Sequence, residues 1–266
     1  MKSGLIVYSS VDHQRNQWFI DKCLLMLNDE QINLFYLDEE KLLSYLNQHD
    51  VGFVIYRGRD YRLLKVLETK GIKTYNNALT NQVANDKYQT YLFLKENGFP
   101  VIESYKDSHS INAYPYIMKS VSGHGGQEVF LINNEKEKEK IVKENPSLSF
   151  IYQEYLPNDG DVRIYVLNKE VVAAVKRKNP SDYRNNYSLG GSVSLYPLSD
   201  EIKTAAVHIS ELLNADYIGL DFLLTKDGYL FNEIEDPVGC RMLYQISNID
   251  IVKMFLEFVR NDLLKR

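Results

Sequence analysis

Cysteine is scarce in this chain: among its 266 residues only Cys23 and Cys240 are cysteines. Their spacing is not that of a metal site, and two thiols fit a reducing compartment better than a disulfide-stapled secreted fold. Long apolar runs are also missing. There is no apolar span of 18 residues, and residues 1–10 hold only a short apolar segment, so we expect neither a membrane helix nor a signal peptide. The sequence therefore predicts a soluble, cytoplasmic protein.

An excess of basic charge is absent as well, since the formal net charge is −5. Nucleic-acid binding needs clustered Lys and Arg, so we expect no nucleic-acid partner. The net charge does not exclude a local basic cleft. The glycine pattern of a dinucleotide fingerprint is also missing after the first expected strand, which argues against a Rossmann dehydrogenase.

The first 78 residues alternate between strand and helix patterns. Short connections between them predict βαβ units and a parallel sheet with helices on its faces. Ligands of such sheets bind beyond the carboxyl ends of the strands, which makes Arg57 and Arg59 candidate substrate-binding residues. The expected strands are 5–8, 32–37, 51–56 and 72–75, and the expected helices are 16–27, 39–47 and 60–70.

A second region contains a glycine-rich hairpin. Residues 114–119 read as a strand that ends in Lys119, residues 120–126 as a turn, and residues 128–132 as the returning strand. Backbone N–H groups in a turn of this kind can close over phosphate oxygens, and Lys119 adds a positive charge at its base. An ordinary hairpin with three glycines is the alternative.

A third region carries charged residues inside strand patterns. Asp161 and Arg163 lie two apart on one expected strand, so both reach the same face. They form either a structural ion pair or, with phosphate nearby, a site where the arginine binds oxygens in a bidentate manner. A long polar loop over residues 183–191 follows, and loops of this kind carry function more often than packing.

An acidic hairpin lies near the end of the chain, with expected strands over residues 219–224 and 229–237. Glu233 and Glu235 alternate on the second strand and share a face that Asp221 of the first strand can also reach. Three converging carboxylates repel one another unless a cation neutralises them, and hard oxygen ligands suit Mg²⁺. The alternative is a solvent-exposed acidic edge.

Taken together and in order, these motifs resemble the ATP-grasp superfamily and, within it, the RimK-like carboxylate–amine ligases. The resemblance implies an α/β fold in which an N-terminal βαβ lobe (1–78) precedes two α+β lobes (79–152 and 153–266) that clamp ATP. It covers residues 71–258 and, weakly, the N-terminal lobe. The matching positions are Asn85-Asp86-Lys87, Pro115 to Lys119, Gly123 to Gly126, Gln153 to Leu156, Asp161-Val162-Arg163, Arg177, Asn186 with Gly190-Gly191, Gly219-Leu220-Asp221 and Glu233-Ile234-Glu235.

The resemblance also implies a role for each motif residue. Lys87, Lys119 and a loop of Gly123, Gly125 and Gly126 would hold the nucleotide phosphates, Gln153, Glu154, Tyr155 and Leu156 would meet adenine, and Asp161 would face the ribose. Arg163, Arg177 and Asn186 would stabilise the transferred phosphate, and Asp221, Glu233 and Glu235 would hold two Mg²⁺ ions, with Mn²⁺ as an alternative.

The implied reaction activates a carboxylate as an acyl phosphate, joins it to an amine of an amino acid or peptide, and releases ADP and phosphate. An ATP-grasp kinase and a non-catalytic nucleotide-binding module are the alternatives, and the family suggests a homo-oligomer. The family shows Glu-x-Asn on the last strand, whereas this chain has Glu235 at the third position. We expect catalysis to be retained there with tighter metal binding. Arg241 is a further candidate for a substrate carboxylate, with a structural ion pair as the alternative.

Overall fold

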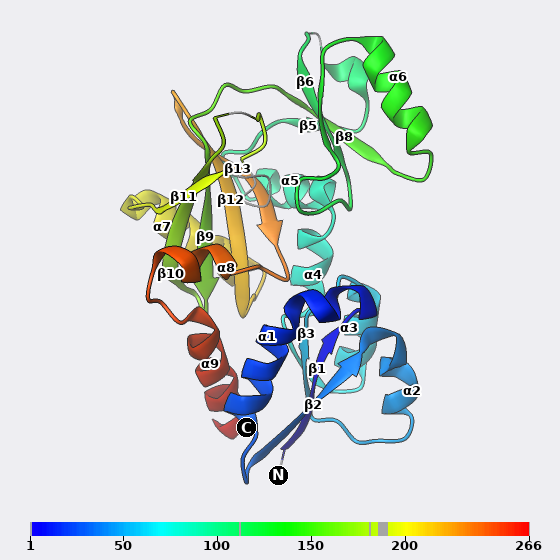
Figure 1. Cartoon of the computed structure of the whole chain (residues 1–266), viewed down its shortest axis with the longest axis vertical. Coiled ribbons are helices and arrows are strands. Elements are labelled where there is room, and N and C mark those ends of the chain that lie inside the picture. The colour runs from blue at the N-terminus through cyan, green and yellow to red at the C-terminus, as the bar shows by residue number, and fades with distance from the viewer. Residues whose placement is uncertain (1, 112, 181, 186–190, 266) are drawn as a thin grey trace.

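The computed structural model describes residues 2–111, 113–180, 182–185 and 191–265. Within these residues the strands form three sheets, one in the N-terminal part and two in the rest of the chain (Figure 1). None of the described helices combines the length and the apolar character needed to cross a membrane.

The N-terminal sheet is parallel, as predicted, with the strand order β2-β1-β3-β4. Its central strand β1 is buried on both faces: Leu5 and Val7 belong to one apolar cluster, and Ile6 and Tyr8 to another. Burial on both faces is typical of a parallel sheet between helices. The elements are β1 (Lys2–Tyr8), α1 (Ser10–Leu27), β2 (Ile32–Asp38), η1 (Glu39–Lys41), α2 (Leu42–Leu46), β3 (Phe53–Tyr56), α3 (Tyr61–Thr69) and β4 (Lys73–Tyr75).

Helix α1 begins at Ser10, six residues before the predicted start, so the sequence prediction was wrong for residues 10–15. The hydroxyl of Ser9 caps the helix by accepting a hydrogen bond from the backbone N–H of Asp12 at 3.2 Å. Asn16, the predicted first residue, has non-helical angles (φ −116°, ψ 15°) and marks a kink. The first turns are polar and largely solvent-facing, which hides their helical periodicity.

The middle of the chain builds a small antiparallel sheet with the order β5-β8-β6-β7. It lies at the far end of the molecule from the N-terminal sheet (Figure 1). The helices α4 and α5 connect the two regions. The elements are α4 (Ala78–Ala84), α5 (Lys87–Glu96), β5 (Ser104–Tyr105), η2 (Ser108–Ser110), β6 (Tyr116–Ser120), β7 (Val129–Ile132), α6 (Glu135–Glu144) and β8 (Phe150–Glu154).

The last sheet has the order β11-β10-β9-β12-β13. Its strand β9 separates core from site by alternation: Val162 and Ile164 pack in the same cluster as Ile209 of α7, while Asp161 and Arg163 face the opposite side. The elements are β9 (Asp161–Leu167), β10 (Glu170–Lys178), β11 (Ser192–Leu195), α7 (Asp200–Leu212), β12 (Tyr217–Thr225), β13 (Gly228–Glu235), α8 (Arg241–Ile246) and α9 (Ile251–Lys265).

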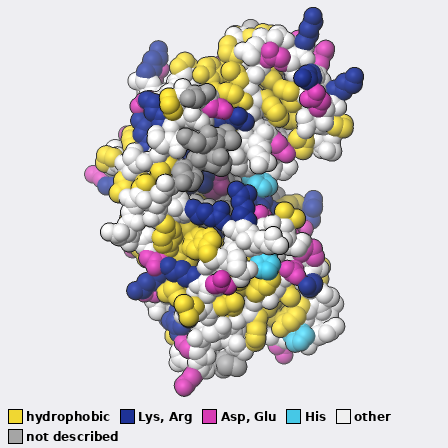
Figure 2. Space-filling model, viewed as in Figure 1, with side chains coloured by type: hydrophobic (Ala, Val, Ile, Leu, Met, Phe, Trp, Pro, Cys, Tyr) yellow, Lys and Arg dark blue, Asp and Glu magenta, His cyan; other side chains and the backbone are white. Residues whose placement is uncertain are grey.

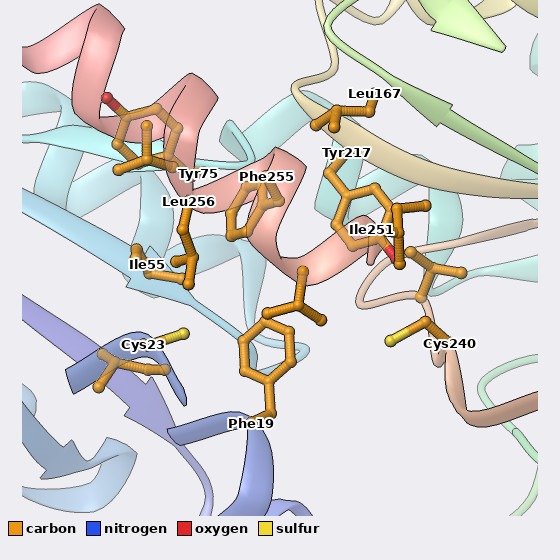
Figure 3. Packing of buried hydrophobic residues seen from close by; sticks show 14 of the residues in the cluster. Phe19, Cys23, Ile55, Tyr75, Leu167, Tyr217, Cys240, Ile251, Phe255 and Leu256 are labelled. Atoms are coloured by element: carbon orange, nitrogen blue, oxygen red, sulfur yellow. The ribbon is translucent and has the colours of Figure 1, made fainter. Parts of the chain in front are cut away.

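One apolar cluster joins the N-terminal sheet to the last sheet through α9. Phe255 of α9 lies between Tyr75 and Tyr217, with ring centroids 6.5 Å and 5.4 Å away (Figure 3). Phe19 of α1 and Leu167 of β9 belong to the same cluster. The two ends of the chain therefore share a core, which fixes the N-terminal lobe against the strands that carry the acidic residues.

Truncation of this shared core should destabilise the protein strongly. Phe255 is 2% exposed, and we expect Phe255→Ala to lower the free energy of unfolding by about 3–5 kcal/mol because it leaves a cavity. Met254, its neighbour, is 41% exposed, so Met254→Ala should change that free energy by less than about 0.5 kcal/mol. Chemical denaturation measures both values, and equal losses would contradict the packing described here.

Candidate active site

The centre of the site is an ion-pair network set by the register of β9, β10 and β12. Arg163 lies opposite Asp221, and Arg177 lies opposite Asp161. Arg163 donates to both oxygens of Asp221 at 2.7 Å and 2.6 Å, and Arg177 donates to both oxygens of Asp161 at 2.6 Å and 2.9 Å. Arg177 also reaches Asp221 at 2.7 Å, and Arg163 also donates to Glu235. These bidentate contacts fix the planes of both guanidinium groups.

The network is buried, and its pKa values follow from charge pairing. Burial alone would raise the pKa of Asp221, but Arg163 and Arg177 outweigh it and lower that pKa to about 2. Burial raises the pKa of Asp161 above its usual range despite Arg177. Burial would lower the pKa of Arg163, but Asp221 and Glu235 raise it. Asp221 is therefore ionised at neutral pH.

Three carboxylates converge beside this network. Asp221, Glu233 and Glu235 each offer an oxygen within 4.8 Å of the other two, which is a suitable arrangement for a metal ion. Asp221 is buried, and the two glutamates are partly exposed. Charged oxygen ligands at this spacing fit Mg²⁺, which keeps several positions for water and substrate phosphates.

Asn232 is a site residue that the sequence reasoning missed. A β-bulge separates the pairs Asp221–Glu233 and Phe222–Phe231, so Asn232 is the extra residue of β13. Its side-chain oxygen accepts a hydrogen bond from Lys119 at 2.7 Å. The sequence contains a signal of this bulge, because the apolar residues Phe231 and Ile234 are three apart. A regular strand would place them on opposite faces, whereas both lie in the same core cluster.

Two lysines face Glu233 from the other side of the cleft. Lys119 is the second-last residue of β6 and lies 3.7 Å from Glu233, and Lys87 begins α5 and lies 3.9 Å from it. Asp86 caps α5 by accepting from Tyr88 N–H at 2.9 Å, which places Lys87 at the first helical position. Burial lowers the pKa of Lys119, and Glu233 partly opposes that shift.

A cavity lies between the middle and last sheets. The charged groups Lys119, Asp161 and Glu233 occupy part of its wall. The apolar side chains in the wall include Ile102, Ile117, Val129 and Leu223. The residues predicted to meet adenine also line the cavity, namely Gln153, Glu154, Tyr155 and Leu156.

The glycine-rich turn contacts other elements of the site. Lys87 donates to the carbonyl of Gly123, and Gly125 and Gly126 have left-handed φ values of 70° and 75°. Arg184 donates to the carbonyl of Gly126 at 3.3 Å, so the polar loop predicted over residues 183–191 reaches the turn. Two predicted residues of that loop, Asn186 and Gly190, lie outside the described residues.

The three predicted substrate arginines differ in placement. Arg57 is 7% exposed, lies 4.8 Å from the Phe19 ring centroid and donates to the carbonyl of Val238 at 2.7 Å. This enclosure places Arg57 between the lobes, and the substrate contact predicted for it from the sequence stays a prediction. Arg59 is partly exposed, pairs with Asp12 at 2.8 Å and lines a pocket at the carboxyl ends of β1 and β3.

Arg241 is exposed at the start of α8, where it donates to the carbonyl of Arg15 and to the side chain of Asn16. Figure 2 shows Lys and Arg side chains gathered at the hollow in the middle of the molecule. Basic side chains thus gather at this hollow, although the formal net charge of the chain is −5.

Comparison with solved structures places this architecture among the ATP-grasp proteins. D-alanine–D-alanine ligase from Bacillus anthracis, solved with ATP, superposes with a TM-score of 0.74 over 98% of this chain and 99% of that chain, at 14% identity. More specifically, the model of the RimK-like ATP-grasp domain matches residues 60–259, and the chain belongs to this family.

Two curated relatives are similar to this chain over most of its length. The homologue of uncharacterised protein MG011 from Mycoplasma pneumoniae is 31% identical over 91% of this chain and 86% of its own length. A probable alpha-L-glutamate ligase of Hahella chejuensis is 26% identical over 76% of this chain and 71% of its own length. The predicted family, ATP-grasp fold and enzyme class, a ligase that forms C–N bonds, are confirmed.

Removal of one member of the buried network should be costly because it leaves charges without partners. We expect Arg163→Met to lower the free energy of unfolding by about 3–5 kcal/mol, since Asp221 and Glu235 lose their shared cation. Lys176→Met is the control, because its pair with Asp159 is solvent-exposed on the aspartate side and should contribute less than about 1 kcal/mol. Denaturant titration without nucleotide compares the two, and a loss below 1 kcal/mol for Arg163→Met would refute the description.

Proposed function

We propose that this protein uses ATP to convert a substrate carboxylate into an acyl phosphate, which an amine of an amino acid or peptide then attacks. One observation carries the proposal: two arginines and three carboxylates on neighbouring strands face two lysines across a cavity. Attack of a carboxylate on a phosphoryl group brings negative charges together. Cations fixed in advance stabilise that arrangement without reorganising.

In this proposal the nucleotide occupies the cavity between the middle and last sheets. Lys87 and Lys119 contact its phosphates, and the turn of Gly123, Gly125 and Gly126 closes over them with its backbone N–H groups. Gln153, Glu154, Tyr155 and Leu156 meet adenine beside the apolar part of the wall, and Asp161 faces the ribose. The lining of the cavity supports this assignment because it includes Lys119 and Asp161 as well as apolar side chains.

Asp221, Glu233 and Glu235 are the proposed ligands of two Mg²⁺ ions, with Mn²⁺ as an alternative. The clustered oxygens support this assignment, and the ions would neutralise charge on the transferred phosphate. Arg163 and Arg177 hold the transferred phosphate from the sheet, with Asn186 as a third contact. Asp221 orients both arginines by accepting their hydrogen bonds. The same carboxylate would therefore bind the metal and position the arginines.

The substrates belong to the N-terminal side of the cleft. Arg59 lines a pocket beyond β1 and β3, and its guanidinium can bind a substrate carboxylate in place of its contact with Asp12. Arg241 is a second candidate for a carboxylate because it is exposed near the kink of α1. The glutamate ligase among the relatives supports an amino acid as the amine substrate.

A trapping experiment tests the reaction. Incubation with ATP, Mg²⁺, hydroxylamine and a panel of amino acids and peptides should give a hydroxamate, because hydroxylamine intercepts an acyl phosphate. ADP release and mass spectrometry provide the readout. A phosphorylated product that is stable without any amine would establish a kinase instead, and nucleotide binding without turnover of any acid would establish a non-catalytic module.

Glu235 stands where the family has Asn, and this difference leads to a separate prediction. Glu235→Asn should keep ADP release within about tenfold of wild type, since an amide oxygen can replace the carboxylate as a Mg²⁺ ligand. It should also raise the Mg²⁺ concentration needed for half-maximal ADP release. Glu233→Gln is the comparison, because Glu233 also faces both lysines. Complete loss of ADP release in Glu235→Asn would contradict this interpretation of Glu235.

A further inference from the structure

A buried polar network lies directly after the strand that carries Glu233 and Glu235. Asp236 is 5% exposed and follows the last residue of β13. Its two carboxylate oxygens accept hydrogen bonds from Asn76 and Asn81, each at 2.9 Å. Its backbone carbonyl accepts a third from Asn85 at 2.7 Å. Three asparagine amides thus hold one aspartate.

Neutral side chains hold this buried carboxylate directly. Among the described residues, no lysine or arginine forms an ion pair with Asp236, so neutral amides alone bind its oxygens directly. A buried carboxylate whose oxygens bind only neutral amides loses hydration that these hydrogen bonds only partly replace. Such a network specifies one orientation of the groups in it. The group it orients is the chain segment immediately after Glu235.

The amide of Asn81 links this segment to the substrate side of the cleft. Its nitrogen donates to Asp236 and also to the carbonyl of Gly58 at 3.1 Å. Gly58 directly precedes Arg59, whose guanidinium lines the pocket beyond β1 and β3. Asn81 is 1% exposed, so water does not compete for its hydrogens. One side chain therefore touches both the Arg59 loop and the neighbour of Glu235.

Asn76 fixes the same segment from the other side. Its nitrogen donates to the carbonyl of Tyr217 at 2.7 Å as well as to Asp236, and its oxygen accepts from the backbone N–H groups of Asp216 and Tyr217. Every hydrogen-bonding group of this amide is therefore used. Asn76 joins the start of β12, the strand of Asp221, to the end of β13, the strand of Glu235.

We propose that Asp236 and Asn81 are positioning residues, which hold Glu235 in its place at the metal site and connect it to the loop of Arg59. The inference rests on the proposed function, because it assigns Glu235 to the metal. Outer contacts that orient a ligating carboxylate change metal affinity by about 10–100-fold when they are removed. Because one amide serves both sides, loss of the network weakens metal binding and loosens the Arg59 loop together.

Binding of Mg²⁺ and a non-hydrolysable ATP analogue tests the proposal without turnover. Asn81→Ala and Asp236→Asn should each weaken calorimetric binding of the analogue in the presence of Mg²⁺ by about tenfold or more. Binding of the analogue in EDTA should be unchanged, because the lysines and the glycine-rich turn are intact. Equal weakening with and without Mg²⁺, or no weakening in either variant, would overturn the proposal.

Asn77→Ala is the matched control. Asn77 caps α4, the helix that contains Asn81. Its side chain donates to the carbonyls of Leu213 and Asn214 at 2.9 Å and 2.8 Å, away from β13. We expect this variant to lower the melting temperature but to keep the Mg²⁺-dependent affinity of wild type. A loss of that affinity comparable to the loss in Asn81→Ala would mean that general destabilisation, and not orientation of Glu235, causes the effect.

A double variant that exchanges the residues at positions 81 and 236 separates the hydrogen bond of Asn81 to Asp236 from its hydrogen bond to Gly58. Combining Asn81→Asp with Asp236→Asn restores a hydrogen bond between positions 81 and 236 with donor and acceptor exchanged, but leaves the carbonyl of Gly58 without its donor. We expect most of the Mg²⁺-dependent affinity to return. Affinity as low as in the single variants would show that the link to Glu235 does not act as proposed. Normal binding of Mg²⁺ and analogue by wild type, without hydroxamate formation, would overturn the proposed function and not this inference.

Discussion

The bidentate ion pair between Arg163 and Asp221 is the interaction on which the rest of the site depends. It spans two neighbouring strands at the centre of the last sheet and is almost fully enclosed. A single buried charge there would be strongly unfavourable, so neither residue can be explained without the other. Arg177 and Glu235 extend the pair on either side. The register of β10, β9, β12 and β13 is therefore tied to the charge balance of the site.

The alternation of β9 shows how one strand serves both stability and chemistry. Val162 and Ile164 face α7 and its apolar cluster, while Asp161 and Arg163 face the cleft. Farther along the cleft side, Tyr165 and Leu167 pack in the cluster shared with α9 and the N-terminal sheet. The same face thus changes from polar to apolar within a few residues. The position of the N-terminal lobe is set by the apolar part and the site by the polar part.

Much of the site could be predicted from the sequence because strand alternation is local. Glu233 and Glu235 share a face with Asp221, as their spacing predicted. The contact of Asn232 with Lys119 was missed because it depends on a bulge, which interrupts alternation. The surroundings of Arg57 could not be predicted for a different reason: its position after β3 is a local property, whereas its enclosure by Phe19 and Val238 comes from packing between distant segments.

The ion pairs also explain why a second glutamate is tolerable on the last strand. Four cations surround the site, Arg163, Arg177, Lys87 and Lys119, and they face four carboxylates, Asp161, Asp221, Glu233 and Glu235. The side chains alone therefore balance. Nucleotide phosphates would bring further negative charge beside these balanced side chains, so bound Mg²⁺ should strengthen phosphate binding. Because Arg163 balances Glu235 in this chain, we expect nucleotide and Mg²⁺ to bind together. Each should raise the affinity of the protein for the other by the same factor.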